Sequence, residues 1–300
     1  MNMRPLICAA LLVTLPLAGH AQTPPPAALS GPITLRYKYA AGETRRYKLT
    51  LDMDMTMHRA STSSAARPLP PMRQHMEMLY SQTVQSVRPD GAATLVGHIT
   101  QMTATLNGHA LPLPKAMTGA YAGNFTTVMS PTGKLLSMAL PPSVQGKMPR
   151  GIDLSKMGGM APASLPDKPV RVGDTWRGAA DLGQMLGSAV PGMPDMQINV
   201  VSSLARVEPG GIADIRQQLE GTIGSTLPAG NAGSVKMRGR ITGDTLMKFN
   251  VKAGEITGKD GTTHMVASVL PVLLASAKKV GMINMDMTMK THWEQLPATP

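Results

Sequence analysis

The stretch Leu51-Asp52-Met53-Asp54-Met55-Thr56-Met57 alternates apolar and polar side chains, and Asn284-Met285-Asp286-Met287-Thr288-Met289 nearly repeats it close to the other end of the chain. A period of two is typical of a β-strand with two unlike faces. The two stretches are therefore expected in equivalent or adjoining positions of a sheet. The pleat places each set of thioethers on one face: Met53, Met55 and Met57 in the first stretch, and Met285, Met287 and Met289 in the second.

Alternation of the same kind continues outward from these stretches, and turn residues interrupt it. Ala41-Gly42-Glu43 predicts a tight turn between two strands of a hairpin, and Arg88-Pro89-Asp90-Gly91 predicts a second turn. Residues 59–73 have no period and contain three prolines, which favours a long loop. The expected strands cover 33–39, 47–57, 76–87, 93–106 and 282–293.

Four turn signals of the first half recur in the same order in the second half. The offsets lie between 120 and 131 residues. This order predicts two duplicated, curved antiparallel sheet units in a mainly β protein of the β-rich α+β class. The matched signals are Gly42-Glu43-Thr44 with Gly173-Asp174-Thr175, residues 87–91 with 207–211, Gly123-Asn124 with Gly243-Asp244, and Gly133-Lys134-Leu135 with Gly254-Glu255-Ile256.

The first residues are those of a secretory leader. Arg4 precedes an apolar run from Leu6 to Leu17, and Gly19-His20-Ala21 provides a small-x-small cleavage site. The mature protein is therefore expected in the periplasm or outside the cell, without a membrane anchor. The single cysteine, Cys8, lies within the leader, so the mature chain would contain no disulfide.

These signals give an expected organisation for the whole chain. The expected segments are a signal peptide over 1–21, a disordered Pro- and Ala-rich lead-in over 22–32, a first β unit over 33–150, a linker with a short helix over 151–168, and a second β unit over 169–297.

Composition and charge restrict the partners. The chain has 29 Lys and Arg against 18 Asp and Glu, a formal net charge of +11, so an anionic membrane surface is one expected partner. Nucleic acid is disfavoured by export and by the absence of aromatic residues among the basic ones. A basic patch would combine Arg36, Lys38, Arg45, Arg46 and Lys48, unless these residues form only an ordinary charged outer face.

The segment Leu165-Pro166-Asp167-Lys168-Pro169-Val170-Arg171-Val172-Gly173-Asp174-Thr175-Trp176 resembles the signature of a family of exported bacterial proteins known as a domain of unknown function. The opening Leu35-Arg36-Tyr37-Lys38-Tyr39, with Gly42 and Tyr47, resembles that family's first hairpin. The resemblance implies an envelope location and a β-rich fold. It carries no catalytic residues.

Methionine is the most unusual component, with 25 residues against two Phe and two Trp. Flexible thioethers fill irregular cores and also adapt to varied apolar ligands. A buried core and an apolar groove for a lipid-like or peptide ligand therefore remain two interpretations of the same pattern. The groove hypothesis assigns its lining to Met53, Met55, Met57, Trp176, Met285, Met287 and Met289, although Trp176 also suits a packing anchor.

Metal handling is the alternative hypothesis, because thioethers are soft ligands that favour Cu(I). Its candidate copper ligands are Met55, Met57, His75 and Met287. No linear enzyme motif is present, neither Gly-x-Ser-x-Gly nor His-Glu-x-x-His nor a phosphate-binding loop. The sequence thus leans toward binding or scaffolding without a cofactor, and it leaves an activity without a linear motif open.

Overall fold

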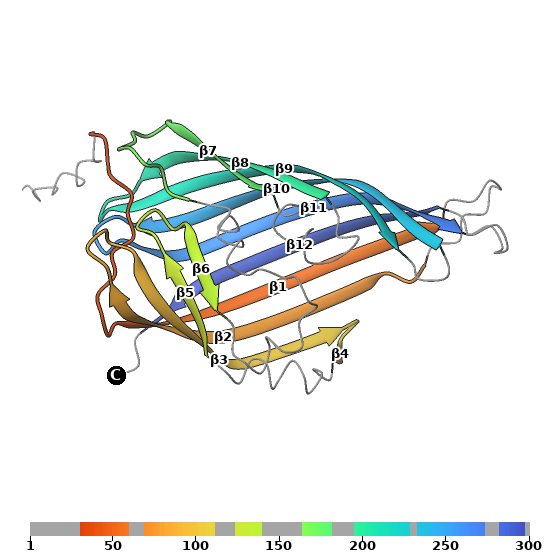
Figure 1. Ribbon diagram of the computed structural model, residues 1–300, viewed down its shortest axis with the longest axis horizontal. Helices are drawn as coiled ribbons and strands as arrows, with labels where there is room; N and C mark the ends of the chain where they lie inside the picture. Colours follow the sequence, from red (N-terminus) through yellow and green to blue (C-terminus); the bar gives the residue numbers. More distant parts are fainter. Residues whose placement is uncertain are drawn as a thin grey trace, which may run out of the picture.

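The computed structural model describes residues 31–59, 69–111, 124–139, 164–181, 195–228, 233–273 and 282–297. In these ranges the chain forms twelve strands of one antiparallel sheet and no helix (Figure 1). A membrane-spanning helix is accordingly not found among the described residues. The expected leader, most of the lead-in and most of the linker, with its short helix, lie outside them.

The N-terminal half of the chain supplies one side of the sheet. Strands expected over 47–57, 76–87 and 93–106 are confirmed, the first two with somewhat wider bounds. These strands are β1 (Thr44–Arg59), β2 (Met72–Val87), β3 (Ala93–Leu106), β4 (His109–Ala110), β5 (Phe125–Met129) and β6 (Leu135–Ala139).

The C-terminal half supplies the other side, and its last strand confirms the one expected over 282–293. These strands are β7 (Thr175–Asp181), β8 (Asp195–Val207), β9 (Ile212–Pro228), β10 (Gly233–Asn250), β11 (Glu255–Leu273) and β12 (Ile283–Leu296). The order across the sheet is β6-β5-β3-β2-β1-β12-β11-β10-β9-β8-β7, with β4 paired to β3.

The expectations of an α+β class and of two duplicated sheet units are not supported. β1 pairs with β12 along its length, from Arg46 opposite Leu296 to Arg59 opposite Ile283. Each of these strands would expose a row of unpaired backbone groups if the two halves formed separate sheets, and their pairing satisfies those groups. A single continuous sheet is the result.

Some of the matched turn signals nevertheless share a backbone conformation. Gly42 and Gly173 have φ angles of 85° and 93°, and their amides donate to the carbonyls of Val84 and Leu204 at 2.8 Å. A left-handed φ favours glycine at both positions. Gly243 differs, because it lies inside β10 and marks no turn.

Residues 31–41 do not form the first strand of a hairpin. They cross the end of the sheet as an extended segment, which we call the cap. Backbone hydrogen bonds hold the cap to turns that are distant in sequence. Tyr37 N donates to Pro131 O at 2.8 Å, Lys38 N donates to Gly254 O at 2.9 Å, and Ile33 forms a bridge with Val170.

The cap hydrogen-bonds to other chain segments instead of to a partner strand, although its alternation is strand-like. Its odd-numbered side chains pack inward, and Leu35 is fully buried. The main core lies at this end of the sheet. It consists of Ile33, Leu35, Leu165, Val170, Leu204, Val207, Ala213, Ile215, Met247 and Phe249.

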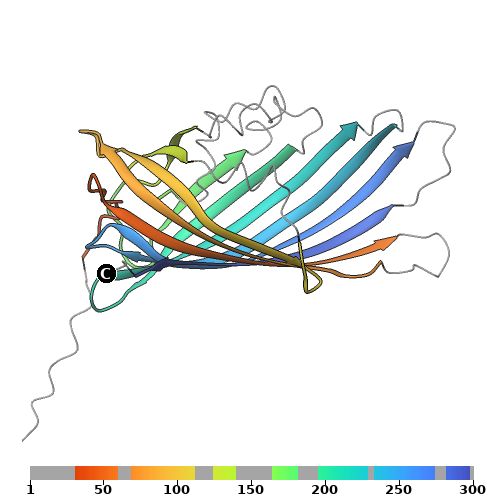
Figure 2. The same cartoon turned by 90° about the horizontal axis from the view of Figure 1, so that it is seen from below.

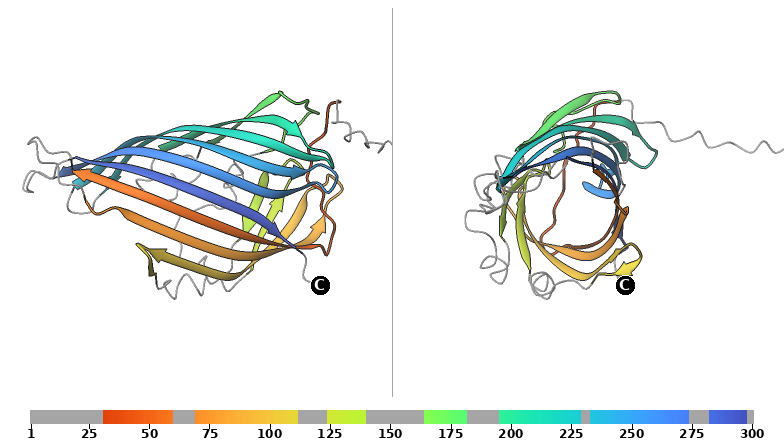
Figure 3. Two further views of the ribbon diagram at one scale, coloured as in Figure 1. Left: turned by 180° about the vertical axis from the view of Figure 1, so that it is seen from behind. Right: turned by 90° about the vertical axis from the view of Figure 1, so that its right-hand side faces the viewer.

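The sheet is strongly curved, and the two edge strands, β6 and β7, bend toward the same side (Figures 2 and 3). One cavity is lined by residues of β1, β2, β3, β5, β6, β11 and β12 together with the cap. We call the face of the sheet that lines this cavity together with the cap the concave face, and the opposite face the convex face. The concave face carries Tyr47 and, further along β1, Met53, Met55 and Met57.

Glycines on the concave face allow this curvature. A Cβ at Gly239 would lie 2.6 Å from Val266 O and 2.8 Å from Ala267 Cβ. A Cβ at Gly221 would lie 2.5 Å from Gln197 O. Neighbouring strands therefore approach more closely than any other residue permits, as is usual where a sheet bends sharply.

Candidate functional site

The two methionine stretches meet on the concave face. β1 and β12 are adjacent, and their register places Met53 opposite Met289, Met55 opposite Met287 and Met57 opposite Met285. β11 continues the middle row with Met265, which lies opposite Met287. All seven methionines are half-buried. The expected adjacency of the two stretches is confirmed.

Trp176 lies away from these methionines, on the edge strand β7, with β8 to β11 between it and β12. Its ring packs against the main core, and its indole N–H donates to Ser164 O at 2.9 Å. Trp176 shares the concave face, because it pairs with Ser202, which is hydrogen-bonded to Gln217. The contacts of its side chain are those of a packing anchor.

His75 lies on the opposite, convex face. It is paired with Asp52, and its Nδ1 is 2.7 Å from Asp52 Oδ1. Met55 and Met287 project to the concave face, so these thioethers and the imidazole do not converge. The described residues contain no group of three His, Cys, Asp or Glu side chains that is suited to a metal ion.

An aromatic pocket of about 430 Å³ lies at the capped end of the concave face. Tyr47 is central to its wall, with ring centroids 4.7 Å from Trp293 and 5.1 Å from Tyr80. Trp293 Nε1 donates to Tyr80 Oη at 2.7 Å. The pocket is lined by Tyr37, Tyr39, Arg45, Tyr47, Tyr80, Gln82, Leu95, Thr127, Met129, Leu135, Met138, Ile256 and Trp293.

Most polar groups of the aromatic pocket have a hydrogen-bond or ion-pair partner within the protein. Arg45 Nε lies 2.7 Å from Glu43 Oε1 and 3.2 Å from Glu255 Oε2. Burial raises the pKa of Tyr47 to about 12, so its phenol stays protonated at neutral pH and can donate a hydrogen bond. The buried hydroxyl of Thr127 has no hydrogen-bond partner among the described residues.

Lys259 places an amine on the concave face. It lies on β11 directly opposite Trp293 of β12 and Met247 of β10, which is buried in the main core. Residues directly opposite one another in an antiparallel sheet project to the same face. Desolvation by burial lowers the pKa of the Lys259 amine. Lys259 therefore stands between the aromatic pocket and the methionines.

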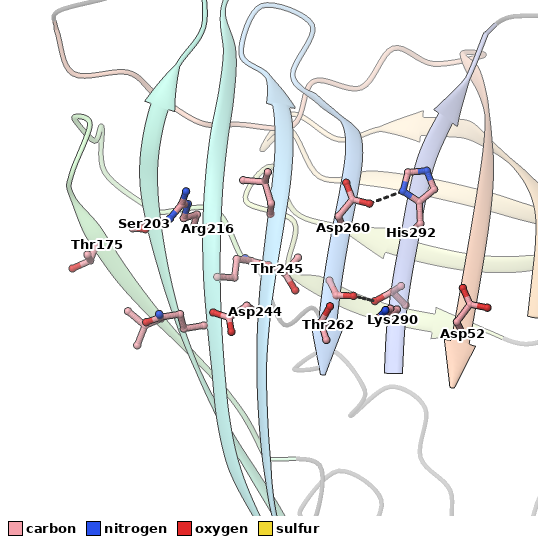
Figure 4. A pocket seen from close by; sticks show the side chains of 16 residues that line it. Asp52, Thr175, Ser203, Arg216, Asp244, Thr245, Asp260, Thr262, Lys290 and His292 are labelled. Carbon is pink, nitrogen blue, oxygen red and sulfur yellow. Dashed lines mark hydrogen bonds and ion pairs between the residues drawn. The ribbon is translucent and has the colours of Figure 1, made fainter. Parts of the chain in front are cut away.

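The convex face is mostly polar, with Val201, Val266 and Leu270 as exposed apolar exceptions, and it carries a shallow groove of about 780 Å³ (Figure 4). In this groove His292 Nδ1 lies 2.6 Å from Asp260 Oδ1, and this contact raises the pKa of the imidazole. Asp244, Arg216 and Lys290 line the same surface. Cross-strand pairs of this kind are typical of the solvated face of a sheet.

The basic residues of the sequence analysis do not form one patch. Arg36 donates to the carbonyls of Pro166 and Asp167, so it binds the segment that precedes β7. Arg45 points into the aromatic pocket, whereas Lys48 lies on the convex face 2.8 Å from Glu77. The expected patch required the segments around Arg36 and Lys48 to be neighbouring strands. Because the cap is not part of the sheet, these residues do not share a face.

Lys259 and the aromatic pocket were not expected from the sequence. A signal for Lys259 existed, because it shares its alternation phase with Gly261, Thr263, Met265 and Ala267, where a charged side chain is unusual. The aromatic pocket gave no such signal. Its walls come from strands at both ends of the chain, and only the β1–β12 pairing brings Tyr47 beside Trp293.

No family model and no curated protein matches the chain. One similar structure is that of lipovitellin, described for its lipid–protein interactions. It matches 88% of this chain and 26% of that chain at 13% identity and a TM-score of 0.44. Pseudomonas aeruginosa OccK5 (OpdH) matches 86% of this chain and all of that chain at 8% identity and a TM-score of 0.24. A Rh. blastica porin mutant matches 83% of this chain and 99% of that chain at 9% identity and a TM-score of 0.21. The chain spans about a quarter of the lipovitellin chain. These values assign the chain to no family and no function.

Proposed function

We propose that the concave face binds a lipid-like apolar ligand. The observation that carries the proposal is the contrast between the faces of one sheet. Met55, Met287 and Met265 form a continuous thioether row on the concave side, whereas Asp52 and Lys290 belong to the polar convex side. The thioether row is half-buried, and no second layer of strands or helices covers it within the described ranges.

A lipid-like ligand suits this surface better than a peptide. Each peptide group brings an amide and a carbonyl that need hydrogen-bond partners once they leave water. The thioethers of Met53, Met55 and Met287 are at most weak acceptors and donate nothing. An acyl chain makes no such demand, and flexible methionines can repack around it.

The test compares two substitutions on adjacent residues of β12. Met287→Gln puts an amide on the concave face, and Thr288→Gln puts the same amide on the convex face as the matched control. The neutral dye N-phenyl-1-naphthylamine is titrated into delipidated protein and its fluorescence gain is measured. We expect Met287→Gln to weaken dye binding at least fivefold and Thr288→Gln to leave it unchanged.

Thermal unfolding of the same variants separates a groove from a core. If Met287→Gln lowers the melting temperature while dye affinity stays at the wild-type value, the methionines are packing material and the proposal fails. Absence of dye binding by the wild-type protein would also overturn it. Organic extraction of protein purified from its own host, followed by mass spectrometry, checks for a retained lipid.

A Cu(I) site is the second candidate, favoured by one observation. Met55, Met287 and Met265 lie side by side across three adjacent strands, and three thioethers are a soft ligand set. His75 is on the other face, so such a site would use sulfur alone. Equal Cu(I) affinity of the wild type and Met287→Leu in a competition titration would exclude it.

We further propose that this binding takes place in the cell envelope, where the leader expected over 1–21 would deliver the protein. The basic net charge would favour an anionic membrane surface as the source of the ligand. Fractionation of the host cell tests the location. Recovery of the mature chain in the cytoplasm would contradict it.

A further inference from the structure

Lys259 is an exception on the concave face. Among the described residues of β9 to β12, it is the one charged side chain in register with the methionines. The row through it contains Leu49, Trp293, Met247 and Ile215, all of them apolar or aromatic. Lys259 is half-buried, and an ammonium group in such a row needs an explanation, because removing a charge from water is costly unless the charge is paired.

No protein group supplies that pairing within the described ranges. Neither a hydrogen bond nor an ion pair joins Lys259 Nζ to another described side chain, in contrast to Arg45, which has Glu43 and Glu255. Burial alone lowers the pKa of the Lys259 amine, with no contribution from a neighbouring carboxylate. The protein thus bears a cost that an anionic ligand would remove.

Two hydroxyls adjoin the amine on the methionine side. Gly261 is the next concave residue along β11, and the site where its Cβ would lie is 2.9 Å from Thr245 Oγ1 and 3.1 Å from Thr291 Oγ1. The two threonine hydroxyls, one from each neighbouring strand, therefore lie close to the Gly261 backbone on the concave face. Thr291 Oγ1 donates to Gly261 O at 3.5 Å, a long hydrogen bond that the hydroxyl can exchange for one to a carboxylate oxygen.

Beyond these hydroxyls the face becomes apolar for a considerable length. Ala267 lies eight residues after Lys259, which corresponds to about 26 Å along an antiparallel strand. The methionines of β12 border this part of β11, and those of β1 lie one strand further away. The length of an extended long-chain acyl group matches this stretch, with its polar end at Lys259.

We propose that the ligand is a long-chain fatty acid whose carboxylate is bound by the Lys259 ammonium and by the Thr245 and Thr291 hydroxyls. This inference rests on the proposed lipid-binding function and adds the chemistry of the head group. One ammonium matches one carboxylate in charge. Hydrogen bonds to an ionised partner are also about twice as strong as neutral ones.

The experiment uses two fluorescent probes with the same acyl chain, cis-parinaric acid, whose carboxylate is charged, and its neutral methyl ester. Each probe is titrated into the delipidated full-length mature protein and into two lysine variants. Lys259→Met keeps length and apolar volume while removing the charge. Lys290→Met is the matched control, because Lys290 is an exposed lysine on the convex face of the neighbouring strand.

We expect Lys259→Met to weaken binding of the acid at least tenfold and to leave the ester unaffected. Lys290→Met should change neither affinity. Thr245→Val, which removes one hydroxyl at constant shape, should weaken the acid about threefold. Circular dichroism and the retained affinity for the ester show that each variant is folded.

The outcomes distinguish the inference from the function on which it rests. If both probes bind and Lys259→Met binds the acid as tightly as the wild type, the head-group assignment is wrong and the lipid-binding proposal stands. If neither probe binds the wild type, the proposed function itself fails. Displacement of the probe by phosphatidylglycerol vesicles at lower lipid concentration than by palmitate would overturn the assignment of a monocarboxylate.

Discussion

Met55 of β1 lies directly opposite Met287 of β12, although the two residues come from opposite ends of the chain. This pair belongs to the seam that joins the N-terminal and C-terminal halves into one sheet. The seam also brings Tyr47 beside Trp293 and so builds the aromatic pocket. The pairing of two termini thus creates both the continuity of the sheet and the surface proposed to bind a ligand.

The seam can be cross-linked. Directly opposite residues of an antiparallel pair have Cα atoms about 4.5 to 5.5 Å apart, within the range that a disulfide spans. We expect Met55→Cys with Met287→Cys to oxidise to an intramolecular disulfide. Met55→Cys with Thr288→Cys, which point to opposite faces, should stay reduced. Mass spectrometry after alkylation measures both, and no bridge in the first variant would contradict the register.

The concave glycines should tolerate no side chain. A Cβ at Gly239 meets backbone and side-chain atoms of β11 at under 3 Å, so Gly239→Ala should destabilise the protein by roughly 2 kcal/mol. Gly224 lies in β9 with open space around it, and Gly224→Ala should be neutral or stabilising by about 0.5 kcal/mol. Urea unfolding compares the two, and equal effects would refute close strand approach at Gly239.

Lys259 should lower the stability of the ligand-free protein. Its pKa is lower in the folded than in the unfolded state, so the folded state is penalised while the amine is charged. The penalty declines as pH rises through the folded pKa toward about 10.4, the value of an unperturbed lysine. Its direct cross-strand neighbours, Trp293 and Met247, do not titrate in this range.

We therefore expect Lys259→Met to be more stable than the wild type at pH 7, by on the order of 1 kcal/mol. The advantage should shrink as pH approaches about 10.4. Thermal unfolding across this range is the measurement, with Lys290→Met as the control for surface charge. A destabilised Lys259→Met at pH 7 would show that the amine is stabilised by a group of the protein itself.

The pair of His292 and Asp260 should be visible in a titration. The hydrogen bond to Asp260 raises the pKa of His292 above its ordinary value of about 6.5. Asp260→Asn should lower the pKa of His292, and NMR of the imidazole protons during a pH titration measures this change. The stabilisation that the pair gives is present below pH 6.5 and is lost as pH rises through the raised pKa.

A second aspartate provides the control for this titration. Asp52→Asn alters the neighbouring pair with His75 and should leave the His292 curve in place. Because His292 and Asp260 are both exposed, the effect of their pair on unfolding should be small. An unchanged His292 titration in Asp260→Asn would show that the two side chains are not in contact in solution.

Trp293 should report ligand binding. It is one of two tryptophans, it lines the aromatic pocket, and it lies opposite Lys259. In a Trp176→Phe variant, addition of palmitate should change the intensity or wavelength of the remaining emission. The complementary Trp293→Phe variant keeps only Trp176 in its packing site and should show a much smaller change.

Much of the local structure could be predicted from the sequence, because alternation is a local property of the chain. The strands over 47–57, 76–87, 93–106 and 282–293 were predictable from their period of two, and so was the common face of Met53, Met55 and Met57. The turn glycines were predictable as well, because a left-handed backbone selects glycine whatever the rest of the fold.

At the cap, alternation alone gave a wrong prediction, the strand expected over 33–39. Leu35, Tyr37 and Tyr39 alternate as in a strand, yet their backbone groups bind distant turns, and only their inward side chains follow the pattern. Period two reports which side chains are buried and does not identify the hydrogen-bond partner. The duplicated turn signals misled in a similar way, because equal turns do not determine whether two halves form separate sheets or one.

The sequence by itself determined the strands over 47–57, 76–87, 93–106 and 282–293, the two faces of these strands and the concentration of methionines on one face. The tertiary structure decided that β1 pairs with β12, which face is concave, and that Lys259 stands between an aromatic pocket and the methionines. The physical reason is that side-chain phase is set by the pleat of each strand alone. Strand partners and curvature depend instead on backbone groups and close approaches between residues that are far apart in the chain.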